Sequence, residues 1–146
     1  MRVLSPLFEA AGVDFVLSGH EHSYQRTRPL RFAPTEASRA SHINEADRRV
    51  SGKFTIDRQF DGVNATRPQG IIYITTGAGG KSLYDAGYSP EPSKWRLADD
   101  GFEDYVALFN SDRYSLTLFD VETNSLTMTQ TDEFGGTLDK IRVTKA

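Results

Sequence analysis

Two apolar runs stand out from a chain whose other segments mix polar and apolar residues. Residues 13–17 (Val-Asp-Phe-Val-Leu) and residues 71–75 (Ile-Ile-Tyr-Ile-Thr) are nearly continuous in apolar and β-branched side chains. Such runs lack the alternation of a strand with one solvated face, and they are typical of strands buried on both faces of a sheet. The pattern therefore predicts two buried strands at these positions.

The segment before the first run predicts a short helix. Apolar residues recur there at the spacing of a single helix face: Leu4, Leu7, Phe8 and Ala11. Ser5 and Pro6 suit the N-cap and the first helical position, and Gly12 suits the position just past the C-terminus. A short helix that leads into a buried strand is half of an α/β unit.

Residues 102–146 predict a β-meander. Apolar and polar residues alternate there in four segments of strand length, namely residues 105–109, 114–120, 126–131 and 138–143. Short stretches rich in Asn, Asp and Gly separate the segments, and these residues favour hairpin turns. Together with the helix and the two buried strands, the meander predicts an α+β fold that is mainly antiparallel β with one short N-terminal helix.

Residues 30–69 form a polar and charged stretch between the two apolar runs. Only residues 53–57 within it have the pattern of a strand. Long connections inside a compact domain tend to be lids or binding segments. We therefore expect a lid-like insertion here.

The composition limits the classes of protein and of binding partner that the sequence allows. The chain has 146 residues, enough for a single domain, and 11% of them are aromatic, which argues against disorder. A formal net charge of −3 gives no electrostatic footprint for nucleic acid or for an anionic membrane. No apolar run is long enough to span a bilayer, and the first residues lack the pattern of a signal peptide. Cysteine is absent, which excludes disulfides and thiolate metal sites.

Two of the three histidines, His20 and His22, follow the first predicted strand directly after Gly19. In an extended backbone, residues two apart point to the same side, so both imidazoles can converge on one site. The end of a buried strand is also where open α/β sheets bind their ligands. The alternative is a pair of solvated loop histidines, and the third histidine, His42, has the same alternative in the polar stretch.

Residues 19–26 (Gly-His-Glu-His-Ser-Tyr-Gln-Arg) resemble the last metal-binding motif of the calcineurin-like metallophosphoesterases. The closest likeness is to the purple acid phosphatase branch, where G-H-x-H is followed by x-Y-E-R; Gln25 stands in the place of that glutamate. Residues 13–18 look like the family strand before the motif, and residues 70–83 are similar to the strand and glycine loop that follow the family's lid. The resemblance implies that the chain is the C-terminal half of a layered αββα metallophosphoesterase sandwich, a single partial domain.

The resemblance also implies a metal centre. In that family each histidine of the motif binds a different one of two divalent or trivalent ions, so His20 and His22 would ligate separate ions of iron, zinc or manganese. The ions hold a phosphate ester and lower the pKa of a bound water, which attacks phosphorus. Tyr24 and Arg26 have two interpretations. They bind the substrate, since arginine suits phosphate oxygens, or Tyr24 packs beneath the motif while Arg26 pairs with a carboxylate.

The family's other ligands come from preceding motifs such as D-x-H, G-D-x-x-D and G-N-H, and none of these occurs in the chain. Even catalytic zinc uses three protein ligands. We therefore expect weak metal binding and no catalysis from this chain without the N-terminal half. An open sheet edge and an uncovered apolar face favour self-association. The competing hypothesis is a non-catalytic β-rich binding or structural module. Members of the family are often exported.

Residues 77–82 (Gly-Ala-Gly-Gly-Lys-Ser) follow the second predicted strand and match neither common phosphate-binding pattern. Thr75 stands where a Walker A loop requires glycine, and Ser82 stands where a dinucleotide fingerprint requires its third glycine. A tight turn bordering the metal cleft and a direct phosphate contact are the two interpretations.

Overall fold

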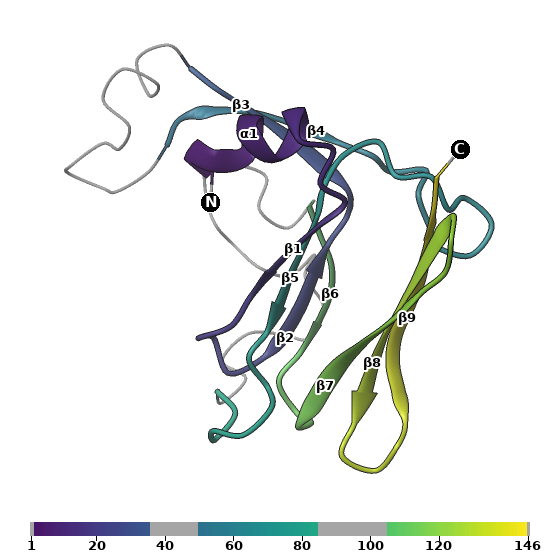
Figure 1. The fold of residues 1–146 in the computed structure, drawn as a ribbon. Helices are drawn as coiled ribbons and strands as arrows, with labels where there is room; N and C mark the ends of the chain where they lie inside the picture. Colours follow the sequence, from purple (N-terminus) through teal and green to yellow (C-terminus); the bar gives the residue numbers. More distant parts are fainter. Residues whose placement is uncertain (1, 36–49, 85–104, 146) are drawn as a thin grey trace.

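The computed structural model describes residues 2–35, 50–84 and 105–145 (Figure 1). This part of the chain contains a 3-10 helix η1 (Arg2–Leu4), one α-helix and nine strands. The elements are α1 (Ser5–Ala10), β1 (Phe15–Ser18), β2 (Tyr24–Thr27), β3 (Leu30–Pro34), β4 (Gly52–Ile56), β5 (Ile72–Thr76), β6 (Val106–Asn110), β7 (Ser115–Val121), β8 (Ser125–Asp132) and β9 (Thr137–Thr144). One short helix with mainly antiparallel strands confirms the predicted α+β class.

The strands form three sheets. A four-stranded sheet has the order β1-β5-β2-β6, in which β1 and β5 are parallel and the other neighbours are antiparallel. The meander β7-β8-β9 faces this sheet, while the hairpin β3-β4 and α1 lie together at one end of it (Figure 1).

The core lies between the four-stranded sheet and the meander. Its buried side chains come from both sheets and from one loop: Tyr24, Phe60, Ile72, Ile74, Met128, Ile141 and Val143. Each fully buried aliphatic side chain contributes about 1.5–3 kcal/mol relative to an exposed one. Along β9, the exposed residues Lys140 and Arg142 alternate with the inward, buried ones. The alternation in the sequence predicted one buried and one solvated face for the meander, and β9 has them. In β7 the prediction is wrong about which face is buried, because Leu116 and Leu118 are 52% and 53% exposed while Ser115 is buried.

The two apolar runs are the parallel pair β1 and β5, with Phe15 opposite Ile72. Burial on both faces holds for β5, where Ile72 and Ile74 are buried in the core and the residue between them is half-buried. The same prediction is wrong for β1, because Leu17 is 49% exposed. The physical reason is that β1 is the edge strand of the sheet, and no element of the described chain covers Leu17.

The helix forms where predicted but begins differently. Leu4 is its N-cap residue and makes no side-chain cap, while Ser5 lies inside the helix with its hydroxyl 3.0 Å from the Tyr73 hydroxyl. Gly12 ends the helix at φ +67°, and Gly12 N–H donates to Glu9 while Val13 N–H donates to Phe8, which is a Schellman motif. Within the described residues, the structure has no helix long and apolar enough to cross a bilayer.

Three strands depart from the predicted pattern. β2 lies in the histidine-bearing stretch where no strand was expected, and it pairs with both β5 and β6. β3 lies at the start of the expected lid and pairs with β4. β6 was expected in the meander, but it joins the four-stranded sheet, so the meander consists of β7 to β9. Within the expected lid, residues 36–49, including His42, lie outside the described residues.

The loop after β4 covers the free edge of β9. Arg142 N–H donates to the Gly62 carbonyl and Thr144 N–H donates to the Thr66 carbonyl, both at 2.8 Å. Gly62 has φ +70°, and a Cβ there would lie 2.5 Å from Cβ of Ile141, so the close approach requires glycine. A covered edge does not offer its backbone groups to another chain.

Asp61 stabilises this loop through hydrogen bonds. These bonds predict that the stability of the fold depends on pH. Backbone hydrogen bonds from Val63 and Ala65, followed by Asn64, lower the pKa of Asp61 from its ordinary 3.8 to about 2. Because the folded pKa lies below the unfolded value, the stabilisation is present above pH 3.8 and is lost as the pH falls through about 2. We expect Asp61→Asn to flatten the loss of stability in this window, measured by acid titration of circular dichroism. Asp120→Asn, on an exposed position of β7, is the control, and parallel curves for the wild type and Asp61→Asn would contradict the assignment.

Candidate metal site at the ends of β1 and β5

Two loops lie against each other at the carboxyl ends of β1 and β5. The histidine loop (residues 19–23) follows β1, and the glycine loop (residues 77–84) follows β5. Because the two strands are parallel, both loops emerge at the same end of the sheet. Gly77 N–H donates to the Ser23 carbonyl at 3.1 Å, and Tyr84 N–H donates to the His22 carbonyl at 3.2 Å. The structure thus joins the two motifs that the sequence holds far apart.

Gly77 is the position where the two loops come closest. A Cβ on Gly77 would lie 1.9 Å from the Glu21 carbonyl oxygen, a distance that no side chain tolerates. At Gly80 the same construction meets nothing within 4 Å. The glycine at position 77 is therefore needed for loop packing, which supports the tight-turn interpretation of this segment.

His22 has the surroundings of a metal ligand. Its Nδ1 lies 2.9 Å from the Ser82 carbonyl oxygen, and its ring stacks on Tyr84 with a centroid distance of 4.5 Å and an interplanar angle of 23°. A carbonyl oxygen can only accept, so Nδ1 carries a proton, and the tautomer with this proton has its lone pair on Nε2. A second ring nitrogen bonded to a backbone carbonyl is the usual arrangement of metal-binding histidines. His22 therefore fits a metal ion bound at Nε2.

His20 occupies an unusual backbone conformation. Its φ is +78°, in the left-handed region that non-glycine residues rarely adopt, and its side chain is exposed. The premise that His20 and His22 share a side because the chain is extended is wrong, since the backbone turns at His20. Such a conformation costs about 1–3 kcal/mol and clusters at functional sites.

Tyr24 and Arg26 point into the space between the two sheets. The Tyr24 hydroxyl donates to Oδ2 of Asp139 at 2.6 Å, and Arg26 donates from Nε to Oδ2 at 2.5 Å and from a terminal nitrogen to Oδ1 at 3.2 Å. Burial, and then the charge of Asp139, raises the pKa of Tyr24 well above its ordinary value. Of the two interpretations, the contacts favour packing of Tyr24 beneath the motif and pairing of Arg26 with a carboxylate.

Three residues of this region were not predicted. Asp139 carried a signal, because it is a charged residue on the inward, otherwise apolar face of β9. Ser82 acts through its backbone carbonyl, which every residue type has, so its identity gave no signal. Tyr84 stacks on His22, which lies in a different loop far earlier in the sequence. No local pattern reports such a contact.

The described residues supply two candidate ligands, His20 and His22. Across residues 2–35, 50–84 and 105–145, three or more His, Asp or Glu side chains nowhere gather into a group that could hold a metal ion. Two imidazoles are fewer than the three protein ligands that a catalytic zinc site uses.

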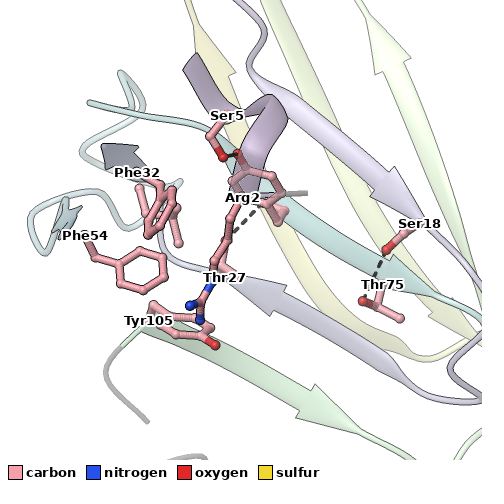
Figure 2. A pocket seen from close by; sticks show the side chains of 10 residues that line it. Arg2, Ser5, Ser18, Thr27, Phe32, Phe54, Thr75 and Tyr105 are labelled. Atoms are coloured by element: carbon pink, nitrogen blue, oxygen red, sulfur yellow. Dashed lines mark hydrogen bonds between the residues drawn. The ribbon is translucent and has the colours of Figure 1, made fainter. Parts of the chain in front are cut away.

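A cavity of about 210 Å³ lies on the face of the four-stranded sheet that points away from the meander (Figure 2). Ser18 and Thr75 form its sheet side, and aromatic rings such as Phe32 and Phe54 form its opposite wall. The Arg2 guanidinium lies 5.5 Å and 5.0 Å from the centroids of these two rings. No histidine or carboxylate is among the described residues that line the cavity.

Comparison with known proteins gives a fold. No family model matches the chain. Over 77 residues, 53% of the chain, it is 34% identical to two uncharacterized proteins of Mycobacterium tuberculosis, one from each of two strains, and it covers 12% of each. Its structure is similar to that of a purple acid phosphatase from yellow lupin (Lupinus luteus) seeds, with a TM-score of 0.57 at 17% identity. That superposition covers 97% of this chain and 19% of the phosphatase.

The chain is phosphatase-like in fold. At 17% identity the likeness carries the fold alone, so the chemistry depends on the residues at the site. The position of this segment in the C-terminal half of a larger domain stays a prediction.

Proposed function

We propose that the chain is part of a dinuclear metal-dependent phosphoesterase that hydrolyses phosphate esters. The observation that carries the proposal is the state of His22. Its Nδ1 donates to the Ser82 carbonyl and leaves Nε2 open, at the carboxyl end of a parallel strand pair in a phosphatase-like fold. His20 and His22 each bind one of the two ions, and iron, zinc or manganese suit imidazole ligands combined with carboxylates.

In this proposal, the metal ions and the residues of this chain have separate roles in the reaction. Bound metal ions of this type hold the phosphate oxygens and lower the pKa of a coordinated water. The chain contributes two neutral imidazoles, which do not balance the charge of two cations. Carboxylate ligands must therefore come from outside the described residues. In our proposal they come from a polypeptide that carries the D-x-H, G-D-x-x-D and G-N-H motifs.

Turnover of p-nitrophenyl phosphate with iron, zinc or manganese tests this function. We expect no turnover by the 146-residue chain alone, and metal-dependent turnover once the polypeptide with the other motifs is added. His20→Ala and His22→Ala should each lower that turnover by at least about 100-fold, because each removes a direct ligand of a catalytic ion. His42→Ala is the matched control and should change little.

Two results would count against the proposal in different ways. Metal-dependent turnover by the chain alone would show that ligands from outside are not needed. Turnover of the complex that survives both His20→Ala and His22→Ala would refute the role of the two histidines.

The second candidate is a non-catalytic β-rich binding or structural module. It is favoured by the absence of a third metal-ligating side chain beside His20 and His22 in the described part of the chain. Under this alternative, the complex with the motif-bearing polypeptide would bind no metal, as measured by calorimetric titration with zinc. Stoichiometric binding of two ions would exclude it.

A further inference from the structure

We propose that the glycine loop is a positioning element for His22, in which the Ser82 carbonyl selects the imidazole tautomer and the Tyr84 ring fixes the imidazole orientation. The inference depends on the proposed function in one respect: the metal ion to which Nε2 is presented belongs to that function. The arrangement itself is a property of this chain and can be measured without metal.

Three contacts from the glycine loop converge on His22. Tyr84 N–H donates to the His22 carbonyl at 3.2 Å and ties the two backbones together. The Tyr84 ring lies nearly parallel to the imidazole at 4.5 Å and restricts the tilt of the ring. The Ser82 carbonyl, 2.9 Å from Nδ1, decides which edge of the ring faces the loop. The two contacts that reach the ring restrict its rotation about the χ2 torsion, so loss of the stacked Tyr84 ring should give it more freedom to turn.

The tautomer matters because it decides which nitrogen can bind a metal ion. A neutral imidazole has one protonated nitrogen and one with a lone pair. Histidine free in water prefers the proton on Nε2, so an unsupported side chain must change tautomer before Nε2 can act as a ligand. The Ser82 carbonyl makes this choice in advance, and such preorganisation strengthens binding because less freedom is lost on binding.

Tyr84 contributes to this arrangement without being part of the core. Its side chain is 44% exposed, and it is not a member of the buried cluster between the sheets. Exposed positions of this kind tolerate substitution with small changes in stability. A change at Tyr84 should therefore act locally on His22 and leave the fold intact.

The loop geometry explains why these contacts are available. The close approach at Gly77, where a Cβ would lie 1.9 Å from the Glu21 carbonyl oxygen, brings the two loops into register. Residues 82 and 84 then lie beside His22. The glycine loop thus positions His22. This role accounts for the loop without a direct contact between the loop and phosphate.

Nitrogen-15 NMR of the histidine-labelled chain tests the inference without metal. Spectra recorded at about pH 8, where imidazoles are neutral, assign the tautomer of each ring from its two-bond couplings. We expect His22 to be protonated on Nδ1, with His20 as the exposed internal reference. Tyr84→Ala should move His22 toward a mixture of tautomers, and Tyr84→Phe should keep the wild-type pattern because its ring still stacks.

Zinc affinity of the complex with the motif-bearing polypeptide provides a second measurement. Loss of a group that orients a ligand usually weakens metal binding by about 10–100-fold. We expect a loss in this range for Tyr84→Ala and wild-type affinity for Tyr84→Phe.

The outcomes separate this inference from the proposed function. A wild-type His22 protonated on Nε2 would overturn the inference, and an unchanged tautomer in Tyr84→Ala would overturn the role of Tyr84. The second result would leave the assignment of His22 as a ligand unchanged. The first would also remove the contact that carries the proposed function, which zinc titration of the complex then tests by itself. An Nδ1–H tautomer that is lost in Tyr84→Ala supports the inference even if the complex binds no metal, and in that case the proposed function fails.

Discussion

Asp139→Ala should lower the free energy of unfolding by about 3–5 kcal/mol, the range found when one partner of a buried ion pair is removed. The side chains of Arg26 and Asp139 are only 12% and 6% exposed. Without the carboxylate, the Arg26 guanidinium stays buried with no opposite charge beside it. The Tyr24 hydroxyl also loses its acceptor at 2.6 Å. Urea denaturation followed by circular dichroism measures the loss.

Two further variants identify the cause. Asp120→Ala removes an exposed aspartate from β7 and should change stability by less than about 0.5 kcal/mol. The double variant Arg26→Met with Asp139→Leu removes both charges and should recover much of the loss, because apolar replacements of a buried pair are often neutral. A double variant no more stable than Asp139→Ala would show that the hydrogen-bond geometry, and not the uncompensated charge, determines the stability.

Gly77→Ala should destabilise the chain by about 1–3 kcal/mol, as overpacking in a tight contact does, and should separate His22 from Tyr84. The added methyl group would meet a backbone carbonyl, which cannot turn away as a flexible side chain can. Nuclear Overhauser contacts between the rings of His22 and Tyr84 report the separation, and urea denaturation reports the stability.

Gly80→Ala is the matched control for this prediction. It places the same methyl group in the same loop, at a position where nothing lies within 4 Å. We expect wild-type ring contacts and stability within about 0.5 kcal/mol. Equal behaviour of Gly77→Ala and Gly80→Ala would contradict the close approach of the two loops.

Hydrophobic pattern alone located most strands but not their partners. β1, β5 and the meander have continuous or alternating apolar side chains, which a local pattern reports. β2 has no such pattern, because its inward side chains include Tyr24 and Arg26, whose polar groups are satisfied by Asp139. The compensating carboxylate is more than a hundred positions away, so no local window contains the reason for the strand.

β3 could have been predicted, and the pairing of β6 could not. Residues 30–34 alternate between buried and exposed, with Leu30 and Phe32 inward, but the surrounding polar residues outweighed this short pattern. β6 has the local pattern of a meander strand, and only its hydrogen bonds to β2 place it in the other sheet. Sheet membership is a tertiary property that strand propensity does not encode.

The sequence predicted the candidate ligands of the site, but not the residues that position them. His20 and His22 follow a buried strand, and the sequence pattern marked both. The backbone turn at His20 and the contacts of His22 with Ser82 and Tyr84 depend on how two distant loops meet. The exposure of Leu17 was missed because an apolar run does not reveal whether its strand lies at a sheet edge.

The long separation between Arg26 and Asp139 has a consequence for biosynthesis. The two residues lie 113 positions apart in the sequence. At a translation rate of about 5–20 residues per second, Arg26 is synthesised roughly 6–23 s before its carboxylate partner. Throughout that interval the nascent chain carries an unpaired cation and unpaired strand edges beside the histidine loop. We therefore expect β2 to be fully stabilised only after β9 docks, whereas the contacts of the histidine loop with the glycine loop can form earlier.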